Sequence, residues 1–319
     1  MIDREMGETL AAAASEYPVV TLLGPRQAGK TTLARATFPD YEYCNLENPE
    51  VRRMAAEDPK QFFAMREGPV ILDEIQRVPE LLSWIQVRVD ENKAKGQYIL
   101  TGSHQLSLHE AVAQSLAGRT ALLRLLPLSM GELQAAGFSM DKNVLMHTGF
   151  MPRIYDDGLE PAGVYANYFR NYVERDVRQL MEIRNLSLFE NFMRLLAGRG
   201  GQPLNLSGLT SDVGVSGTTL KEWISLLEAS FVIFRLTPYY RNFGKEPNLY
   251  FWQDSNRNEV DLIYEKQRRL VPIEIKSAMT WHRDFTANVS KFQRSVSDAE
   301  DGYVIDAGDL FPVGKGFTR

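Results

Sequence analysis

The sequence has almost no cysteine and lacks any long apolar run. Its 319 residues include a single cysteine, Cys44, which cannot form a disulfide within the chain, and this favours a reducing compartment. No stretch approaches the roughly 18 apolar residues of a membrane span. The start of the chain also lacks the basic residues and apolar run of a signal peptide. We therefore expect a cytoplasmic protein without a membrane partner.

The chain also lacks a strong excess of charge of either sign. It has 36 lysines and arginines against 41 aspartates and glutamates, a formal net charge of -5. Such a balance does not by itself require a nucleic-acid partner. Hydrophobic residues make up 44% and charged residues 24% of the sequence, which is ordinary for a globular protein of this length with two or three compact units.

Short apolar segments alternate with helical patterns in the first 126 residues, after a helical pattern at 2–16. This alternation predicts an α/β fold with a parallel sheet that helices cover on both faces. The apolar segments contain few polar residues, as strands buried on both faces do. The expected strands are 18–23, 41–46, 70–73, 97–101 and 121–125, and the expected helices begin near 29 and span 49–66, 79–92 and 108–117.

The segment after the first expected strand has the pattern G-x-x-x-x-G-K-[ST], and a helix is expected to follow it. In such a loop, glycines let backbone N–H groups surround phosphates, and the helix N-terminus adds a positive dipole end. We expect the lysine to bind the β- and γ-phosphates, the first threonine to bind Mg²⁺ and the second to lie near the α-phosphate. The alternative is an ordinary glycine-containing turn. The nucleotide-binding residues are Gly24, Pro25, Arg26, Gln27, Ala28, Gly29, Lys30, Thr31 and Thr32.

The apolar strand 70–73 ends in two carboxylates, Asp73 and Glu74. In a phosphate-loop protein the first carboxylate holds the Mg²⁺ ion together with Thr31. The second would be the general base that polarises an attacking water. The alternative is an acidic pair that only faces solvent. Together with Lys30, these residues predict an enzyme that hydrolyses ATP.

Four further residues, two at the end of a strand and two arginines, are weaker candidates. The polar end of the strand 97–101 could sense the γ-phosphate, and Thr101 or Ser103 could orient the attacking water, although a serine there could equally cap a helix. Arg119 and Arg153 are candidate arginine fingers that would stabilise the transition-state charge. The alternative for each arginine is a surface position or a structural ion pair.

Several strings of this sequence resemble one family. GPRQAGKTTLA, VILDEIQRVPELL, YILTGS and SLAGRTALLRLLPLS look like the prokaryotic AAA-type P-loop ATPases that carry a C-terminal domain of unknown function, near the archaeal STAND-like ATPases. FMPRIYDDG, YVERDVRQL, LLEASFVIFRLTPYYRNFGK and NEVDLIYE with IEIKS resemble the second half of the same family. The resemblance therefore extends over nearly the whole chain.

The resemblance implies an architecture of four parts. An AAA-like core would be followed by a helical lid, a winged helix and a small α/β unit of the restriction-endonuclease type. Relatives carry an additional strand and helix, with a glutamate, between motifs that here nearly touch at Lys245–Glu246. The expected parts are 1–135, 136–185, 186–245 and 246–319.

Two features of the second half suggest chemistry or a partner. Residues 204–234 fit a helix-turn-helix with a following strand, but Lys221 is the only cation near the start of its second helix, so packing or regulation is the preferred interpretation over DNA binding. Asp261, Glu274 and Lys276 fit the D…(D/E)-x-K spacing of endonuclease-like sites, in which two carboxylates bind Mg²⁺. The alternative is strand alternation with charges facing solvent.

Three functional hypotheses follow. The first is an ATP- and Mg²⁺-dependent ATPase that moves the winged helix and the C-terminal domain. The second is an ATP-gated DNA-processing nuclease or DNA-binding regulator. The third is a binding module that uses ATP only as a structural ligand. The partners expected are ATP and either DNA or a protein at the winged helix.

Overall fold

The computed structural model describes residues 1–66, 68–103, 112, 114–171, 186–238, 248–266, 269–307 and 317–318. The chain forms two compact units, Met1–Ile233 and Phe234–Arg319. Within the described ranges, no helix combines the length and the apolar character needed to cross a membrane.

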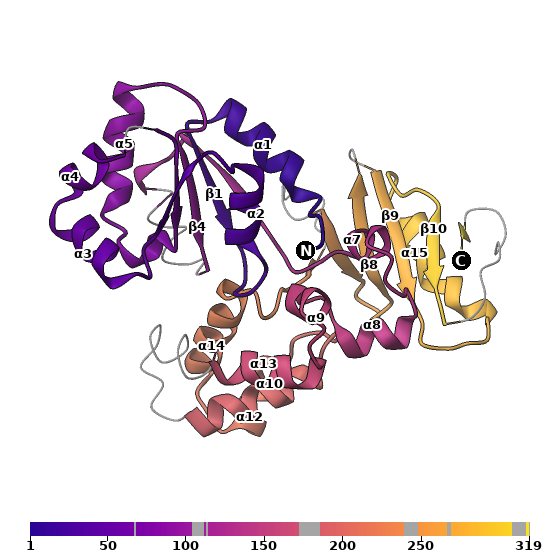
Figure 1. The fold of residues 1–319 in the computed structure, drawn as a ribbon. Coiled ribbons are helices and arrows are strands. Elements are labelled where there is room, and N and C mark those ends of the chain that lie inside the picture. Colours follow the sequence, from indigo (N-terminus) through magenta and orange to yellow (C-terminus); the bar gives the residue numbers. More distant parts are fainter. Residues whose placement is uncertain are drawn as a thin grey trace. The chain divides into compact units, whose positions relative to one another are not determined.

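The first unit contains a five-stranded sheet with the order β2-β3-β4-β1-β5, in which every neighbouring pair is parallel (Figure 1). The expected α/β fold with a parallel sheet is therefore confirmed. Parallel pairing places the carboxyl ends of β1, β3 and β4 at one edge of the sheet. The strands are β1 (Val19–Leu23), β2 (Glu42–Asn45), β3 (Val70–Asp73), β4 (Tyr98–Gly102) and β5 (Thr120–Arg124).

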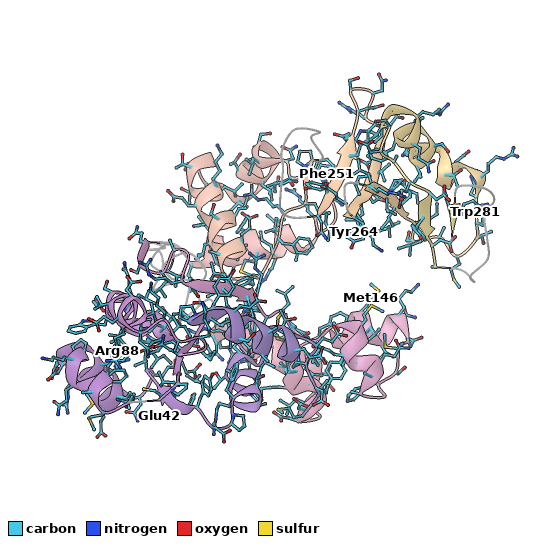
Figure 2. All side chains as sticks on the ribbon, turned by 90° about the horizontal axis from the view of Figure 1, so that it is seen from above. Glu42, Arg88, Met146, Phe251, Tyr264 and Trp281 are labelled. Atoms are coloured by element: carbon cyan, nitrogen blue, oxygen red, sulfur yellow. The ribbon has the colours of Figure 1, made fainter. Side chains whose placement is uncertain are left out.

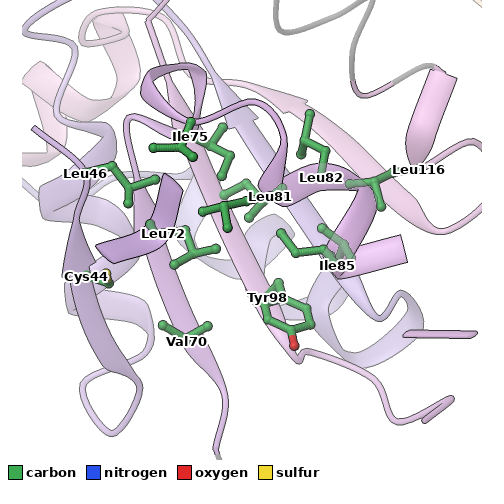
Figure 3. Close-up of a cluster of buried hydrophobic side chains, with 14 of the residues drawn as sticks. Cys44, Leu46, Val70, Leu72, Ile75, Leu81, Leu82, Ile85, Tyr98 and Leu116 are labelled. Atoms are coloured by element: carbon green, nitrogen blue, oxygen red, sulfur yellow. The ribbon is translucent and has the colours of Figure 1, made fainter. Parts of the chain in front are cut away.

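Alternate residues of the central strands point into two separate apolar cores. Leu72 and Leu100 belong to the core on the side of α3 (Pro49–Glu57), α4 (Pro59–Ala64) and α5 (Leu81–Glu91). Figure 3 shows Leu72 in this cluster with Leu81 and Ile85. Ile71 and Ile99 belong to the core beneath α1 (Met6–Glu16) and α2 (Lys30–Thr37). Burial of both faces explains why these strands contain almost no polar residues.

The predicted helix 49–66 is two helices, α3 and α4. Asp58 interrupts it with a non-helical backbone, and its carboxylate accepts a hydrogen bond from Gln61 N at 2.9 Å. Pro59, at the first position of α4, cannot donate the backbone hydrogen bond that a continuous helix would need. The single-helix prediction was therefore wrong at this proline.

Short helices complete the first unit. The helices α12, α13 and α14 enclose an apolar cluster that includes Phe189, Phe192 and Trp223. The helix pair expected at 204–234 is present, but residues 230–236 contain no strand. Residues 108–111 and 113 of the predicted helix 108–117, and residues 172–183, lie outside the described residues. The remaining elements are η1 (Ile75–Arg77), α7 (Met130–Ala135), α8 (Lys142–Thr148), α9 (Pro152–Asp156), α10 (Pro161–Asn171), α12 (Leu186–Ala197), α13 (Leu206–Val213) and α14 (Gly217–Ala229).

The second unit contains a mixed sheet with the order β11-β10-β9-β8-β7-β6. β8 pairs antiparallel with β7 and β9, whereas β10 pairs parallel with β9. α15 (Ala287–Ser295) packs on β8 and β9, and Figure 2 shows Phe251 and Tyr264 on the adjacent strands β7 and β8. The strands are β6 (Thr237–Pro238), β7 (Leu249–Gln253), β8 (Glu259–Lys266), β9 (Arg269–Ile275), β10 (Gly302–Ile305) and β11 (Phe317–Thr318), and the 3-10 helix η3 (Arg283–Thr286) precedes α15. The Lys245–Glu246 junction lies outside the described residues.

Candidate functional site

Residues 24–29 form a tight loop between the end of β1 and the start of α2. Gly24 lies directly against neighbouring backbone, since a Cβ there would be 2.0 Å from the carbonyl oxygen of Leu125. Gly29 has a φ of 90° at the N-cap of α2, a conformation that glycine adopts without strain. The two glycines thus let the loop close over the helix N-terminus, where free N–H groups and the helix dipole attract anions.

Lys30 is the first residue of α2, and its side chain turns back into the loop. Its Nζ donates to the carbonyl oxygens of Gly24 at 2.9 Å and Pro25 at 2.8 Å. The residue is only 6% exposed. Burial lowers the pKa of Lys30 to about 8, although the charges of Glu74 and Asp73 act in the opposite direction. A phosphate beside this ammonium would favour its charged form.

Asp73 ends β3 and accepts hydrogen bonds from three hydroxyl groups. Thr31 Oγ1 donates to both carboxylate oxygens at 2.9 and 3.0 Å, and Tyr43 OH donates to Oδ2 at 2.8 Å. Thr101 Oγ1 donates to Oδ1. Asp73 is 6% exposed, so these hydroxyls replace the water that a carboxylate needs. Because the Thr31 hydroxyl donates its hydrogen bond to Asp73, the lone pairs of Thr31 Oγ1 remain available to a metal ion.

Glu74 follows immediately and has an unusual backbone. Its φ of 57° lies in the left-handed region, which is uncommon for a residue with a side chain. Its N–H donates to Thr101 Oγ1 at 3.2 Å, so one hydroxyl contacts both acidic residues. Its Oε2 accepts hydrogen bonds from Ser103 Oγ at 3.1 Å and from Gln76 Nε2. These contacts hold the carboxylate at the carboxyl edge of the sheet.

A cavity of about 740 Å³ opens beside the loop, within the size range of small-molecule sites. Lys30, Thr31, Thr32 and Glu74 line it together with Arg26, Gln27 and Gly29 of the loop. The N-terminal residues 1–4 and the C-terminal half of α2 form further parts of the wall, as do residues of α9. The cavity therefore combines a phosphate-binding loop with apolar and polar surface on which a larger group can rest.

Comparison with protein families agrees with this geometry. Residues 16–134 match the family model described as an AAA domain. Residues 16–134 therefore correspond to an AAA domain. Residues 142–253 match a domain of unknown function (DUF8612), and residues 226–317 match another (DUF4143). The resemblance inferred from the sequence is thereby confirmed, including a second half without an assigned role.

The similar proteins of known sequence do not indicate a function, because both are named as uncharacterized proteins. Uncharacterized proteins of Mycobacterium bovis and Mycobacterium tuberculosis are each 30% identical over 246 residues, which is 76% of this chain. The chain spans about half of their length, 55%.

Solved structures with a similar chain path have low identity. The Walker-type ATPase of Pyrococcus abyssi is 16% identical with a TM-score of 0.48, over 72% of this chain and 90% of that one. A STAND protein of Pyrococcus horikoshii is 12% identical with a TM-score of 0.30, over 70% of this chain and 39% of that one. Such values say nothing about substrate or partner.

Of the two candidate arginine fingers, Arg119 lies within the AAA domain and Arg153 lies after it. Arg119 directly precedes β5, and Val19 N, at the start of β1, donates to its carbonyl oxygen. It therefore lies at the amino edge of the sheet, about 15 Å from the phosphate loop by the length of a five-residue strand. Its guanidinium is paired with Asp90 at 2.7 Å. Arg119 is thus no part of this site, whereas Arg153 borders the cavity and is paired with Asp157 at 2.9 Å.

The second unit brings Asp261, Glu274 and Lys276 together. β8 and β9 pair antiparallel with Leu262 opposite Ile273, so Asp261 and Glu274 are the next residues along the two strands. Asp261 Oδ2 accepts a hydrogen bond from Ile275 N at 2.7 Å. Lys276 Nζ lies 2.5 Å from Glu274 Oε1. Glu274 is 2% exposed and its Oε2 has no hydrogen-bond partner. Burial raises the pKa of Glu274, with a further rise from the charge of Asp261.

Three residues of the AAA domain site escaped the sequence analysis. Tyr43 comes from β2, which the sheet places next to β3 although α3 and α4 separate the two in sequence. Gln76 lies in η1, directly after the acidic pair. Arg4 reaches the loop from the N-terminal segment, where its Nη1 donates to Ala28 O at 2.7 Å. No motif marks these positions, because their role depends on strand order and chain path.

Proposed function

We propose that the AAA domain binds ATP together with Mg²⁺ and hydrolyses it, and that the nucleotide state moves the parts that follow. This proposal depends on one observation: Lys30, Thr31 and Glu74 line the same cavity, and Asp73 accepts a hydrogen bond from Thr31. Cation, hydroxyl and two carboxylates at one loop are the groups that phosphoryl transfer from a nucleotide requires.

Each of these side chains has a defined task. Lys30 exchanges the carbonyl oxygens of Gly24 and Pro25 for phosphate oxygens, and the loop N–H groups bind the phosphate chain. Glu74 accepts a proton from the attacking water. Its hydrogen bonds from Ser103 and Gln76 both end on Oε2, which leaves Oε1 as the oxygen that takes the proton.

Thr31 and Asp73 fit a magnesium ion because both offer hard oxygen donors and Mg²⁺ keeps most of its ligands as phosphate and water oxygens. No group of three or more His, Cys, Asp and Glu in the described ranges forms a metal cage, so any ion here is shared with the nucleotide. When bound, Mg²⁺ would neutralise charge on the phosphates.

The parts beyond the core would respond to the nucleotide. We assign 1–135 to the ATPase core, 136–185 to a helical lid, 186–245 to a winged helix and 246–319 to an endonuclease-like unit. Arg153 on α9 supports the role of the lid, since it borders the same cavity as Lys30. A DNA or protein partner at the helices α13 and α14 would couple this movement to its target.

Two substitutions test the ATPase. Lys30→Ala should weaken ATP binding, measured by calorimetry, by roughly 10- to 100-fold, since hydrogen bonds to charged groups contribute about 1.5–3 kcal/mol each. Glu74→Gln should keep ATP affinity and reduce phosphate release by roughly 10²–10⁴-fold. Arg119→Gln is the matched control and should change neither value. Tight ATP retention without turnover in the unaltered protein would instead support the structural-ligand hypothesis.

A second candidate function rests on Glu274. Its buried, unpartnered Oε2 beside Asp261 suits a divalent cation, and Lys276 could assist an attacking water. The unit would then cleave DNA under control of the ATPase. Plasmid nicking that requires Mg²⁺ and disappears in Asp261→Asn would support this function, and DNA that stays intact with and without ATP would exclude it.

A further inference from the structure

The guanidinium of Arg4 joins three separate segments of the first unit. Its Nη1 donates to the carbonyl oxygen of Ala28 at 2.7 Å, and its Nη2 donates to those of Leu126 at 2.7 Å and Pro127 at 3.2 Å. Its Nε donates to Glu132 Oε1 at 2.9 Å. The planar fork of arginine suits such simultaneous contacts, which a lysine ammonium cannot reproduce.

Glu132 supports this guanidinium from the other side. It is 5% exposed, and its Oε1 also accepts a hydrogen bond from Glu5 N at 2.9 Å. Its Oε2 accepts one from Ser129 N at 2.8 Å, as part of the capping box that starts α7. The carboxylate is therefore fixed by backbone groups from two segments, and the orientation of the Arg4 side chain is fixed with it.

The contact with Ala28 acts on the phosphate loop itself. A trans peptide is planar, and its C=O and N–H point in opposite directions. Arg4 holds the C=O of the Ala28–Gly29 peptide, so the N–H of Gly29 must point away from Arg4. Gly29 lines the cavity, and its N–H is one of the amides that a phosphate-binding loop uses. Without Arg4, this peptide could rotate and lose that orientation.

We propose that Arg4, oriented by Glu132, is a positioning residue that fixes the phosphate-binding amide of Gly29 and couples the loop to α7. This inference rests on the proposed nucleotide binding at the same site. It concerns phosphate affinity in particular, because the contact acts on the loop amide. Substitution of Arg4 should therefore lower the affinity for a ligand more strongly when the ligand makes more phosphate contacts with the loop.

The test compares ADP and AMP binding, with Mg²⁺, by calorimetry on the full chain. Arg4→Met keeps much of the side-chain length and removes the donors, so we expect ADP affinity to fall at least about 10-fold and the ADP-to-AMP affinity ratio to shrink. Arg4→Lys should restore only part of the ratio. Arg119→Met is the matched control, since it removes an arginine–carboxylate pair at the opposite edge of the sheet.

The outcomes separate this inference from the proposed function. If the unaltered protein binds ADP and Lys30→Ala does not, but Arg4→Met keeps the full ADP-to-AMP ratio, the positioning role is wrong and the nucleotide site stands. If the unaltered protein binds no nucleotide, both fail. An equal loss of ADP and AMP affinity would indicate general damage and contradict the proposal. Should Arg4→Met not fold, Glu132→Gln tests the same ratio, because it retains an oxygen for Arg4 but not the charge.

Discussion

One buried hydroxyl, that of Thr101, connects the two acidic residues of the site, and its removal is a sharp test of the geometry. Thr101 is fully buried, donates to Asp73 and accepts from Glu74 N. Thr101→Val keeps the shape of the side chain and removes both hydrogen bonds. A bond to a carboxylate contributes about 1.5–3 kcal/mol and a neutral one about 1 kcal/mol, so the loss should be roughly 3 kcal/mol of unfolding free energy.

Thr21→Val is the matched control for this substitution. Thr21 is equally buried in the same sheet, and its Oγ1 shares one neutral hydrogen bond with Thr120 Oγ1 at 3.0 Å. Thermal unfolding should show a drop of roughly 6–12 °C for Thr101→Val and about 2–4 °C for the control, for a unit of this size.

Turnover completes the test. Because Glu74 loses its backbone anchor, Thr101→Val should also lower the rate of phosphate release by roughly 10- to 100-fold, whereas Thr21→Val should leave it unchanged. If Thr101→Val has the same melting temperature as Thr21→Val and hydrolyses ATP at the normal rate, the Thr101 hydroxyl does not link Asp73 and Glu74, and the proposed geometry of the site is wrong.

Three further predictions concern the loop and its surroundings. The folded-state pKa of Lys30 is lowered from 10.5 to about 8; ATP affinity should thus fall above pH 8. The unfolded chain holds this proton up to a higher pH than the folded chain. Without nucleotide, the free energy of unfolding should therefore rise between pH 8 and 10.5, and Lys30→Met should not show this rise in denaturation experiments. Gly24→Ala should abolish ATP binding and lower the melting temperature, because its Cβ would meet the carbonyl of Leu125. Arg119→Gln should leave phosphate release unchanged and alter stability by less than about 1 kcal/mol, as exposed ion pairs do.

The sequence was informative wherever a function depends on neighbours along the chain. The loop 24–31 follows a buried strand, and the pair Asp73 and Glu74 stands at the end of another. Strand ends can be located from apolar patterns. Parallel pairing then brings those ends to one edge without any knowledge of the strand order. This is why the loop lysine, its threonine and the two carboxylates were all placed at one site.

Contacts across the sheet could not be predicted in the same way. Tyr43 bonds to Asp73 only because β2 lies beside β3, and Arg4 meets Ala28 only because the N-terminal segment crosses the loop. The position of Arg119, by contrast, could have been predicted from the sequence, and this would have removed it from the candidate arginine fingers. It precedes a strand that runs parallel to β1, so its position at the amino edge followed from the predicted topology.

The role of Glu274 can be decided without assuming any activity. Its pKa is raised by burial and by Asp261, so the unfolded chain releases this proton at lower pH than the folded chain. Stability should therefore fall as pH rises above the usual value of 4.5, until the folded group has ionised. A carboxylate that destabilises its own unit at neutral pH is understandable if a cation offsets its charge.

Magnesium titration of thermal stability at pH 7.5, without nucleotide, distinguishes a metal site from a structural residue. If Glu274 binds the ion, Mg²⁺ should raise the melting temperature of the unaltered protein, and Glu274→Gln should be more stable without Mg²⁺ and gain nothing from it. Glu300→Gln, at the exposed pair with Arg269, should respond to Mg²⁺ like the unaltered protein. If Glu274→Gln gains as much from Mg²⁺ as the unaltered protein does, the ion binds elsewhere. The buried carboxylate would then only orient Lys276 and the end of β9, and the nuclease hypothesis would lose its main support.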